Sequence, residues 1–412
     1  MPRPSLWRVT TTERAKLAVA AVFILNGLAF ASWVSRVPAI RDSLDLTPGR
    51  VGLLLLCLSA GTAVALPLSG AVVSRIGPAR TILLTSLMGA VGLVVMAAGL
   101  AATAIPVVGV GMLVYGMGTS AWDVAMNVEG ADVERRLDRT LMPRFHAGFS
   151  AGTVIGALAG AGCARLNIGL PTQLVGTAVV VLAAVPVAVR SFTPVETEDP
   201  DAEPSPSVLT AWREPRTLMI GLVVLAFALC EGIANDWVAL ALVDGYDAGE
   251  SLAAAGFAVF VSAMTLGRIF GGSVVERLGR VTTLRITGVL VALGVAGVVW
   301  SPGLPGALAG AALWGVGASL GFPLGMSAAA DDERRSAGRV AVVSSIGYTA
   351  FLGGPPLVGL LADSIGVRQA IVVAAVAGLA GALVAWATAP QRVPAVASGY
   401  GDRQAPARPR SS

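Results

Sequence analysis

The chain has 412 residues, of which 55% are hydrophobic and 13% are charged, with a mean hydropathy of +0.76. Soluble domains carry about 25% charged residues, so this composition cannot cover a water-exposed globular surface. Because a membrane-spanning helix needs about 20 apolar residues, the chain has room for about a dozen of them. We therefore expect an all-α integral membrane protein.

Scarce residue types exclude several chemistries. The single lysine, Lys16, lies outside any glycine-rich turn, which excludes a phosphate-binding P-loop and nucleotide hydrolysis by that route. The single histidine, His146, excludes a multi-histidine metal centre. The cysteines Cys57, Cys163 and Cys230 lie in apolar runs and are interpreted as buried hydrophobic residues. We expect no metal, no cofactor, no bound nucleic acid and no enzymatic activity.

Apolar runs of spanning length recur along the chain, separated by short segments that carry Arg, Gly and Pro. Backbone polar groups in hydrocarbon must be bonded internally, so each run is predicted to be a helix. The first six predicted spans are Ala15–Val34, Val51–Val73, Thr81–Leu100, Ala104–Val128, Phe145–Cys163 and Thr172–Val189. The second six are Leu218–Val243, Leu252–Val275, Val281–Trp300, Pro305–Ala329, Val340–Leu361 and Val367–Thr388.

A segment of different composition, residues 191–215, interrupts the series of spans. It holds five prolines and six acids, which predicts a flexible or extended cytoplasmic linker. The predicted organisation is an N-terminal six-helix bundle (1–190), this linker, a C-terminal six-helix bundle (216–390) and a disordered cytoplasmic tail (391–412).

The distribution of positive charge predicts the orientation. With both termini placed in the cytoplasm, 24 of the 29 Lys and Arg residues lie in or beside cytoplasmic segments. The opposite side keeps Arg36, Arg41, Arg50, Arg165 and Arg368. Positive residues concentrate on the cytoplasmic side of membrane proteins. We therefore expect a multi-pass protein of the cytoplasmic membrane with both ends inside.

The two predicted bundles contain related sequences. Residues 70–77 (Gly-Ala-Val-Val-Ser-Arg-Ile-Gly) align with residues 272–279 (Gly-Ser-Val-Val-Glu-Arg-Leu-Gly) at an offset of 202. Residues 115–120 align with residues 314–319 at an offset of 199. Several matches at nearly one offset predict two parallel repeats about an axis normal to the membrane, with a solute site between them near the midplane.

Two of these segments resemble a known family. Arg75 and Gly77, like Arg277 and Gly279, occupy positions that resemble the inner-loop motif of the major facilitator superfamily. The resemblance covers nearly all twelve spans. It implies the fold of that superfamily and alternating access by rocking of the two halves, with these four residues in the gating loops.

A narrower resemblance lies in the fourth predicted span. Its Asp-Val-Ala-Met-Asn segment, from Asp123 to Asn127, is similar to the Glu-Thr-Ala-Ala-Asn stretch of fucose-permease-like sugar/proton symporters. This resemblance implies a small polar solute, sugar-like or another metabolite, that moves together with protons.

Acids inside the predicted spans are candidates for solute and proton binding, because ionisable groups in the membrane are costly and usually face a cavity or a partner. Asp123 and Asn127 share one face of the fourth span, and Trp122 adjoins them. For each acid, a structural hydrogen bond or ion pair is the alternative. The candidates on the seventh span are Glu231, Asn235 and Asp236.

Other polar and aromatic residues permit two interpretations. Arg268 is a candidate gating residue that pairs with an acid. Arg36 either holds an anionic solute group or, as we favour, extends to the outer interface. His146 either relays protons or, as we favour, lies at an interface. Trp33 and Trp237 are expected in the interfacial aromatic belt.

The sequence predicts a secondary transporter of a small polar solute, coupled to protons. Efflux of a drug-like compound by proton antiport is the second candidate, although the fifth span lacks the Gly-Pro signature of many drug antiporters. A membrane sensor or enzyme is a remote alternative, because the chain offers neither an output domain nor a clear catalytic cluster.

Overall fold

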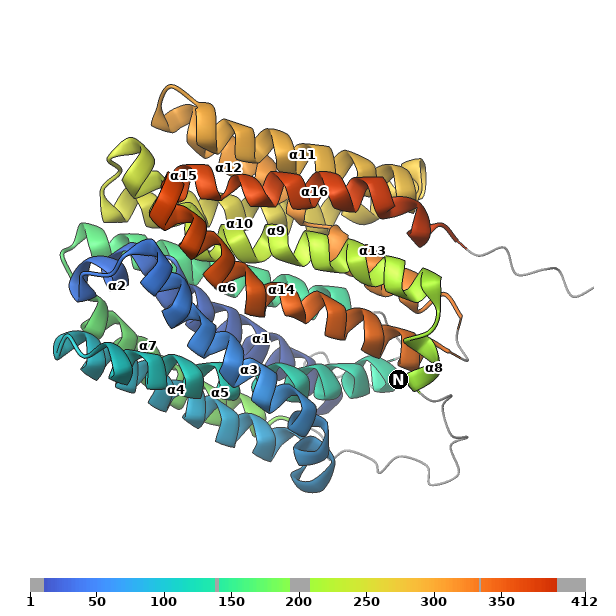
Figure 1. Cartoon of the computed structure of the whole chain (residues 1–412). Coiled ribbons are helices and arrows are strands. Elements are labelled where there is room, and N and C mark those ends of the chain that lie inside the picture. Colours follow the sequence, from blue (N-terminus) through green and yellow to red (C-terminus); the bar gives the residue numbers. More distant parts are fainter. Residues whose placement is uncertain (1–10, 138–140, 193–207, 333–334, 391–412) are drawn as a thin grey trace, which may run out of the picture.

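The computed structural model describes residues 11–137, 141–192, 208–332 and 335–390. Within them, twelve helical segments are long and apolar enough to cross a membrane. The segments run between two ends of the molecule (Figure 1). We name these ends after the short helices that lie there, α2 (Val37–Leu44) and α8 (Val208–Ala211). The predicted fold class, an all-α bundle of twelve spans in two parallel repeats, is confirmed.

The helices before α8 form what we call the N half, and those after it form the C half. Besides α2, the N half contains α1 (Thr11–Val34), α3 (Pro48–Ile76), α4 (Pro78–Ala101), α5 (Ile105–Leu137), α6 (Met142–Arg165) and α7 (Leu170–Val189). The C half contains α9 (Pro215–Tyr246), α10 (Glu250–Leu278), α11 (Arg280–Trp300), α12 (Leu304–Ala318), α13 (Gly321–Ala329), α14 (Ser336–Ile365), α15 (Val367–Ala370), α16 (Val372–Val384) and η1 (Ala385–Thr388).

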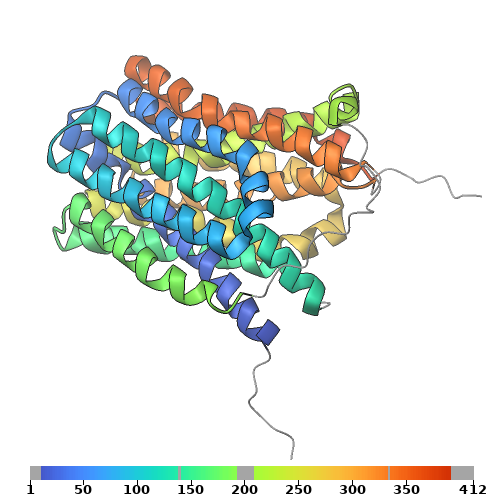
Figure 2. The same ribbon diagram turned by 90° about the horizontal axis from the view of Figure 1, so that it is seen from below.

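The two halves pack in the same way. In the N half, α1 packs against α6, α3 against α5, and α4 against α5 and α7. The equivalent pairs in the C half are α9 with α14, α10 with α12, and α11 with α12 and α16. The halves meet mainly where α3 lies against α14 and α6 against α10. In Figure 1 the blue-to-green N half lies below the yellow-to-red C half, and Figure 2, seen from below, has the N half in front.

Equivalent glycines allow equivalent close contacts in both halves. Gly118 of α5 corresponds to Gly317 of α12, at the offset of 199. A Cβ atom on Gly118 would lie 2.5 Å from the backbone nitrogen of Gly89, and one on Gly317 would lie 2.5 Å from that of Val291. Small residues let membrane helices approach this closely, so the repeat extends to individual helix contacts.

The tenth predicted span coincides with the segment Leu304–Ala329, but its helix is interrupted because of Pro323. Proline has no N–H and its ring excludes the carbonyl four residues earlier, so the carbonyl of Ser319 has no donor within the helix. The helix breaks there into α12 and α13. Arg268 of α10 donates from Nε to this carbonyl at 3.3 Å. The N-half residue equivalent to Pro323 is Val124, and α5 stays continuous.

All twelve predicted spans coincide with observed ones, and α5 shows the largest difference at its end. The apolar run was predicted to end at Val128, whereas α5 continues to Leu137. Asp132 accepts hydrogen bonds from Arg135 at 3.1 Å and Arg136 at 2.7 Å. Such i,i+3 and i,i+4 pairs stabilise a helix beyond its apolar stretch.

The predicted linker and tail lie partly or wholly outside the described residues. The linker is described at residues 191–192 and from residue 208, where the four-residue helix α8 forms and packs against α14. Glu214 accepts hydrogen bonds from Arg339 Nε at 2.6 Å and Thr217 Oγ1 at 2.8 Å. Burial opposes ionisation of Glu214, but these bonds and the charges of Arg339 and Arg335 hold its pKa below the usual value.

Candidate functional site

Asp123 lies near the middle of α5 and has one hydrogen-bonding neighbour among the described residues. Asn127, one turn further along, donates from Nδ2 to the Asp123 main-chain oxygen at 2.8 Å and to its carboxylate Oδ1 at 3.4 Å. No described cation forms an ion pair with the Asp123 carboxylate. The carboxylate of this half-buried residue is therefore oriented by an amide but is not paired with a positive side chain.

Glu231 lies near the middle of α9 and is neutralised. Arg268 of α10 donates from Nη2 to both carboxylate oxygens of Glu231, at 3.0 and 2.9 Å. The same guanidinium donates from Nε to the carbonyl of Ser319. Arg268 thus pairs with an acid inside the C half. For Glu231 the sequence had left open a solute- or proton-binding role and a structural bond to a neighbouring helix, and this structure contains such a bond.

The remaining sequence candidates lie in different surroundings. Asn235 is buried, with 9% of its surface exposed, and Asp236 beside it is half-buried with no ion pair or hydrogen bond to another described residue. Trp122 is 1% exposed and belongs to the apolar core of the N half. Its indole is therefore not available to stack on a solute in this conformation.

Tyr348, which the sequence had not singled out, and His146 each lie near a candidate residue of the opposite half. Tyr348 of α14 lies within the electrostatic range of Asp123. His146 of α6 lies within that of Arg268 and packs edge-on against the ring of Phe23 at 5.3 Å. We name the group that results, with members from both halves, the central polar cluster: Asp123, Asn127, His146, Glu231, Arg268 and Tyr348.

Aromatic rings of the C half adjoin the central polar cluster. The Tyr348 ring lies 6.5 Å from Phe322 of α13 and 6.3 Å from Phe351 of α14. Phe322 is the repeat equivalent of Asp123, at the offset of 199. The cluster therefore combines one carboxylate without a counter-ion, one neutralised carboxylate and a row of aromatic rings.

Arg36 ties the two halves together at the α2 end. It is 3% exposed and donates from Nε to Glu250 Oε1 of α10 at 2.5 Å. Its Nη1 donates to the carbonyl of Ile168 and to Gln173 Oε1, both at 2.9 Å. The expectation that this side chain extends to the membrane interface was wrong, because acceptors from both halves enclose it.

Further cross-half bonds lie at the same end. Arg41 of α2 donates from Nη1 to Asp244 of α9 at 2.5 Å. The N–H of Gly49 donates to Asp363 Oδ1 at 2.9 Å, and Ser251 Oγ donates to the carbonyl of Ala161 at 2.9 Å. At the offset of 202, Ser251 takes the place of Gly49 in its half. The first turns of α3 and α10, which are equivalent in the repeat, thus each bond to the opposite half.

One cross-half bond depends on a proline in α14. Pro355 has no N–H, so the carbonyl of Phe351 four residues earlier lacks a helical donor. Ser59 of α3 donates to that carbonyl at 2.6 Å. The backbone of Pro355 also lies against Gly52 of α3, where a Cβ would be 2.5 Å from the Pro355 carbonyl oxygen. The proline thus supplies an acceptor that joins the halves.

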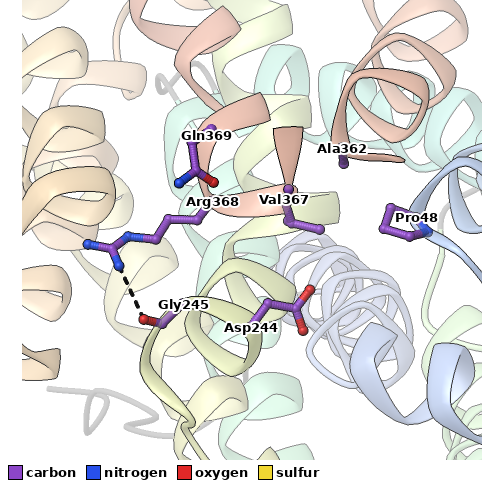
Figure 3. Close-up of a pocket in the computed structure, with 8 residues that line it drawn as sticks. Pro48, Asp244, Gly245, Ala362, Val367, Arg368 and Gln369 are labelled. Atoms are coloured by element: carbon purple, nitrogen blue, oxygen red, sulfur yellow. Dashed lines mark hydrogen bonds between the residues drawn. The ribbon is translucent and has the colours of Figure 1, made fainter. Parts of the chain in front are cut away.

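A cavity of about 250 Å³ lies between the two halves at the α2 end (Figure 3). Pro48 contributes from the N half, and Asp244, Arg368 and Gln369 contribute from the C half. Arg368 is already occupied, since its guanidinium bonds to the carbonyls of Gly245, Val299 and Ser301. Asp244 is bound to Arg41 as well. The charged side chains that line this cavity therefore already have partners at the α2 end.

The four gating-loop candidates lie in two equivalent turns at the α8 end. Gly77 has φ 79° and Gly279 has φ 77°, a conformation that favours glycine. Their N–H groups donate to the carbonyls four residues earlier. Arg75 and Arg277 are exposed and form no ion pair with another described residue. These glycines shape the turns, and a role in gating stays a prediction.

The interfacial position predicted for two tryptophans is wrong. Trp33 and Trp237 are both 0% exposed and belong to the largest apolar cluster. The Trp33 ring packs edge-on against Tyr115 of α5 at 6.1 Å. Their indoles therefore fill the core of the bundle rather than its lipid-facing border.

A twelve-span bundle of two parallel repeats, with polar side chains collected where the halves meet, is typical of a membrane transporter. The family model described as the Major Facilitator Superfamily matches residues 17–332 and 237–412 of this chain. The chain therefore belongs to the Major Facilitator Superfamily of transporters.

Relatives in sequence come from bacteria. An uncharacterized transporter of Sinorhizobium fredii is 33% identical over 370 residues, which cover 89% of this chain and 95% of that protein. An uncharacterized MFS-type transporter of Yersinia pestis is 30% identical over 351 residues, covering 84% and 89%. The membrane protein MosC of Rhizobium meliloti is 26% identical over 368 residues, covering 88% of each.

Solved structures share the fold at low sequence identity. The nucleoside transporter NupG superposes with a TM-score of 0.71 at 14% identity, covering 91% of this chain and 98% of its own. A bacterial homolog of the human lysosomal transporter Spinster gives 0.73 at 14% identity, covering 93% and 98%. The E. coli fucose:proton symporter FucP gives 0.63 at 13% identity, covering 93% and 100%.

Proposed function

We propose that this protein is a secondary active transporter that moves a small polar solute across the cytoplasmic membrane by alternating access, coupled to protons. The solute binds at the central polar cluster, which receives side chains from both halves and lies near the middle of α5 and α9. A site between two repeats can be exposed to either side in turn as the halves rock.

The bonds between the halves support the alternating-access part of the proposal. Those of the described residues lie at the α2 end or, for Ser59, between it and the middle of α3. The arginine distribution assigns the α8 end to the cytoplasm. On this assignment the structure is a state closed toward the outside, and transport requires the α2 end to open.

The observation that carries the coupling is the environment of Asp123. Glu231 already has a partner, since it forms an ion pair with Arg268 at 2.9 Å. Among the described residues, the Asp123 carboxylate accepts a hydrogen bond from the amide of Asn127 and lies within electrostatic range of Tyr348. A carboxylate in such a place is costly to leave charged, so we assign the coupling proton to Asp123.

Reconstituted vesicles test this proposal. A panel of sugars, polyols, amines and drug-like cations is offered with and without an imposed pH gradient. We expect the gradient to drive net movement of at least one class. Asp123→Asn should abolish gradient-driven accumulation by more than tenfold while solute exchange down its own gradient remains. Asp247→Asn, an exposed acid at the end of α9, is the matched control and should transport normally.

Antiport is the second candidate coupling mode, and the same vesicles separate it from symport. In symport, the solute accumulates on the side toward which protons flow, whereas in antiport it moves against them. An acid without a counter-ion suits antiport, because a cationic solute and a proton can replace each other on it. If no compound moves in either direction under any gradient, the transporter proposal is wrong, and a sensor or an enzyme becomes the better interpretation.

A further inference from the structure

The repeat places an acid and an aromatic ring at equivalent positions on the two sides of the site. Asp123 in the N half and Phe322 in the C half are related by the offset of 199. Residues related by a two-fold axis normal to the membrane lie at the same depth and the same distance from that axis. Tyr348, next to Phe322, lies within electrostatic range of Asp123. The position that an exact repeat would give to a second acid is thus held by a ring, Phe322.

No helix packed against α5 brings a positive charge to the depth of Asp123. Its neighbours are α4, α3, α1 and α6. The α14 residue within electrostatic range is Tyr348, which carries no positive charge. The charged residues of the packed helices stand toward their ends: Arg50 and Arg75 on α3, Arg80 on α4, Glu13, Arg14 and Lys16 on α1, and Arg144 and Arg165 on α6. His146 of α6 belongs to the central polar cluster itself.

The one arginine of the central polar cluster is not available to Asp123. Both carboxylate oxygens of Glu231 and the carbonyl of Ser319 accept from Arg268. His146 lies within electrostatic range of this arginine and forms no hydrogen bond or ion pair with an acid among the described residues. The cluster therefore has a negative site that no side chain in it neutralises. The nearby Tyr348 ring and the two rings that pack on it have faces that attract cations.

We propose that Asp123, together with the rings of Phe322, Tyr348 and Phe351, binds the ammonium group of a polar amine, which exchanges with a proton on the Asp123 carboxyl. This inference rests on the proposed function and names the class of its solute. Carboxylate and aromatic faces together are a recurrent way to recognise a quaternary or protonated amine. The amide of Asn127 and the Glu231–Arg268 pair supply hydrogen-bonding groups for the polar remainder of the solute.

The exchange balances in charge and protons. The protonated Asp123 carboxyl releases its proton to water, and the resulting carboxylate pairs with the entering ammonium, whose own N–H bonds stay intact. The site is neutral before and after, so the two occupants compete for one group. A cycle in which each occupant crosses in one direction moves one amine against one proton.

Matched probes test the subsite on the purified full chain. Glucosamine carries an ammonium, while glucose and N-acetylglucosamine have the same ring without that charge. Ethanolamine and ethylene glycol form a second pair. Equilibrium binding at pH 6.5 is expected to favour the charged member of at least one set by more than tenfold. In weakly buffered solution its binding should release protons, and the number released per amine bound should rise toward one as the pH is lowered from 6.5 to 5.

Variants assign the preference to the proposed side chains. Asp123→Asn should remove the preference for the charged probe. Phe322→Leu, which keeps an apolar side chain but loses the ring face, should weaken ammonium binding about threefold, in line with a modest cation–π contribution. Trp300→Leu is the matched control, because this ring at the end of α11 is 67% exposed and α11 contributes no residue to the cluster. It should bind as the unmodified protein does.

The outcomes separate this inference from the transporter proposal. Equal binding of charged and neutral probes, no effect of any ammonium probe, or a preference that survives in Asp123→Asn would overturn the amine subsite. If a neutral solute accumulates in vesicles and this accumulation requires Asp123, the transporter proposal holds and the amine subsite is wrong. Ammonium binding that depends on Asp123 without any flux would keep the subsite and remove the transport function.

Discussion

The two ends of the molecule are held together in different ways. At the α2 end the polar bonds join the halves, as in Arg36 with Glu250, Arg41 with Asp244 and Gly49 with Asp363. At the α8 end, those of the described residues stay within one half, as in Arg216 and Arg280 with Asp331, Arg339 with Glu214 and Arg136 with Asp132.

This contrast teaches which bonds the conformational change must break. Bonds within a half can persist while the halves rock, because the helices they join move together. Bonds between the two halves must break and form again once in each transport cycle. The α8-end pairs should therefore act on stability, and the α2-end bonds on the balance between conformations.

The largest effect is expected from Gly359→Leu in α14. A Cβ at Gly359 would lie 2.7 Å from the carbonyl oxygen of Pro48 and 3.2 Å from the Cα atoms of Gly49 and Gly52. A leucine cannot fit while α14 lies against α3, and overpacking costs about 1–3 kcal/mol or more. We expect the α2 end to stay open and transport to fall more than tenfold.

The measurement is the alkylation rate of a cysteine introduced at Val51, which is 1% exposed, in a chain whose three native cysteines are replaced. Gly353→Leu on the same helix is the control, because a Cβ there meets nothing within 4 Å. An unchanged alkylation rate in Gly359→Leu would show that this contact is not needed to close the α2 end.

A smaller shift is expected from Arg36→Gln. Removing one partner of a buried ion pair costs about 3–5 kcal/mol, and we reduce this to about 2 kcal/mol because Glu250 is one-third exposed. The ratio of closed to open α2 ends should fall roughly 30-fold. The Val51 cysteine reports the change. Arg165→Gln, an exposed arginine at the same end, should leave its alkylation rate unaltered.

Asp331→Asn tests the bonds that lie within one half at the α8 end. Asp331 accepts from Arg280 through both oxygens at 3.0 Å and from Arg216 at 3.1 Å. Losing the charge should lower the free energy of unfolding by about 1 kcal/mol, measured as a lower melting temperature. Alkylation at Val51 should not change. Faster alkylation would mean that bonds within the C half also set the conformational balance.

The smallest effect is a pH dependence at Glu214. Its pKa is lowered in the folded protein, so its contribution to stability is complete above its ordinary value near 4.5 and is lost as pH falls through the lower folded value. We expect about 0.5–1 kcal/mol, since the pair is partly exposed. Melting temperatures from pH 6 down to pH 3.5 should fall more steeply for the unmodified protein than for Glu214→Gln. Parallel curves would contradict this assignment.

The fold could be predicted from the sequence because its cause is local. Each span needs its own run of apolar residues, so hydropathy alone located all twelve. The break between α12 and α13 was also within reach, since Pro323 leaves the carbonyl of Ser319 without a helical donor. The extension of α5 was missed because side-chain pairs around Asp132, rather than hydrophobicity, continue the helix.

The site could be predicted only in part, because its cause is not local. The unusual position of Asp123 within an apolar run singled it out. Its lack of a counter-ion depends on where Arg268 points, and that depends on the break at Pro323 and on Glu231. The repeat offset did contain one usable signal, since it pairs Asp123 with Phe322 in the amino-acid sequence itself.

The hydrogen bonds of Arg36 have a consequence for how easily the α2 end opens. Two of its three acceptors, the carbonyl of Ile168 and Gln173, belong to its own half. When the halves part, the guanidinium keeps both and must gain water at a single position. Most of the hydrogen bonds of Arg36 are thus kept when the α2 end opens. The height of the opening barrier depends on how readily water takes the place of Arg36 at the Glu250 carboxylate.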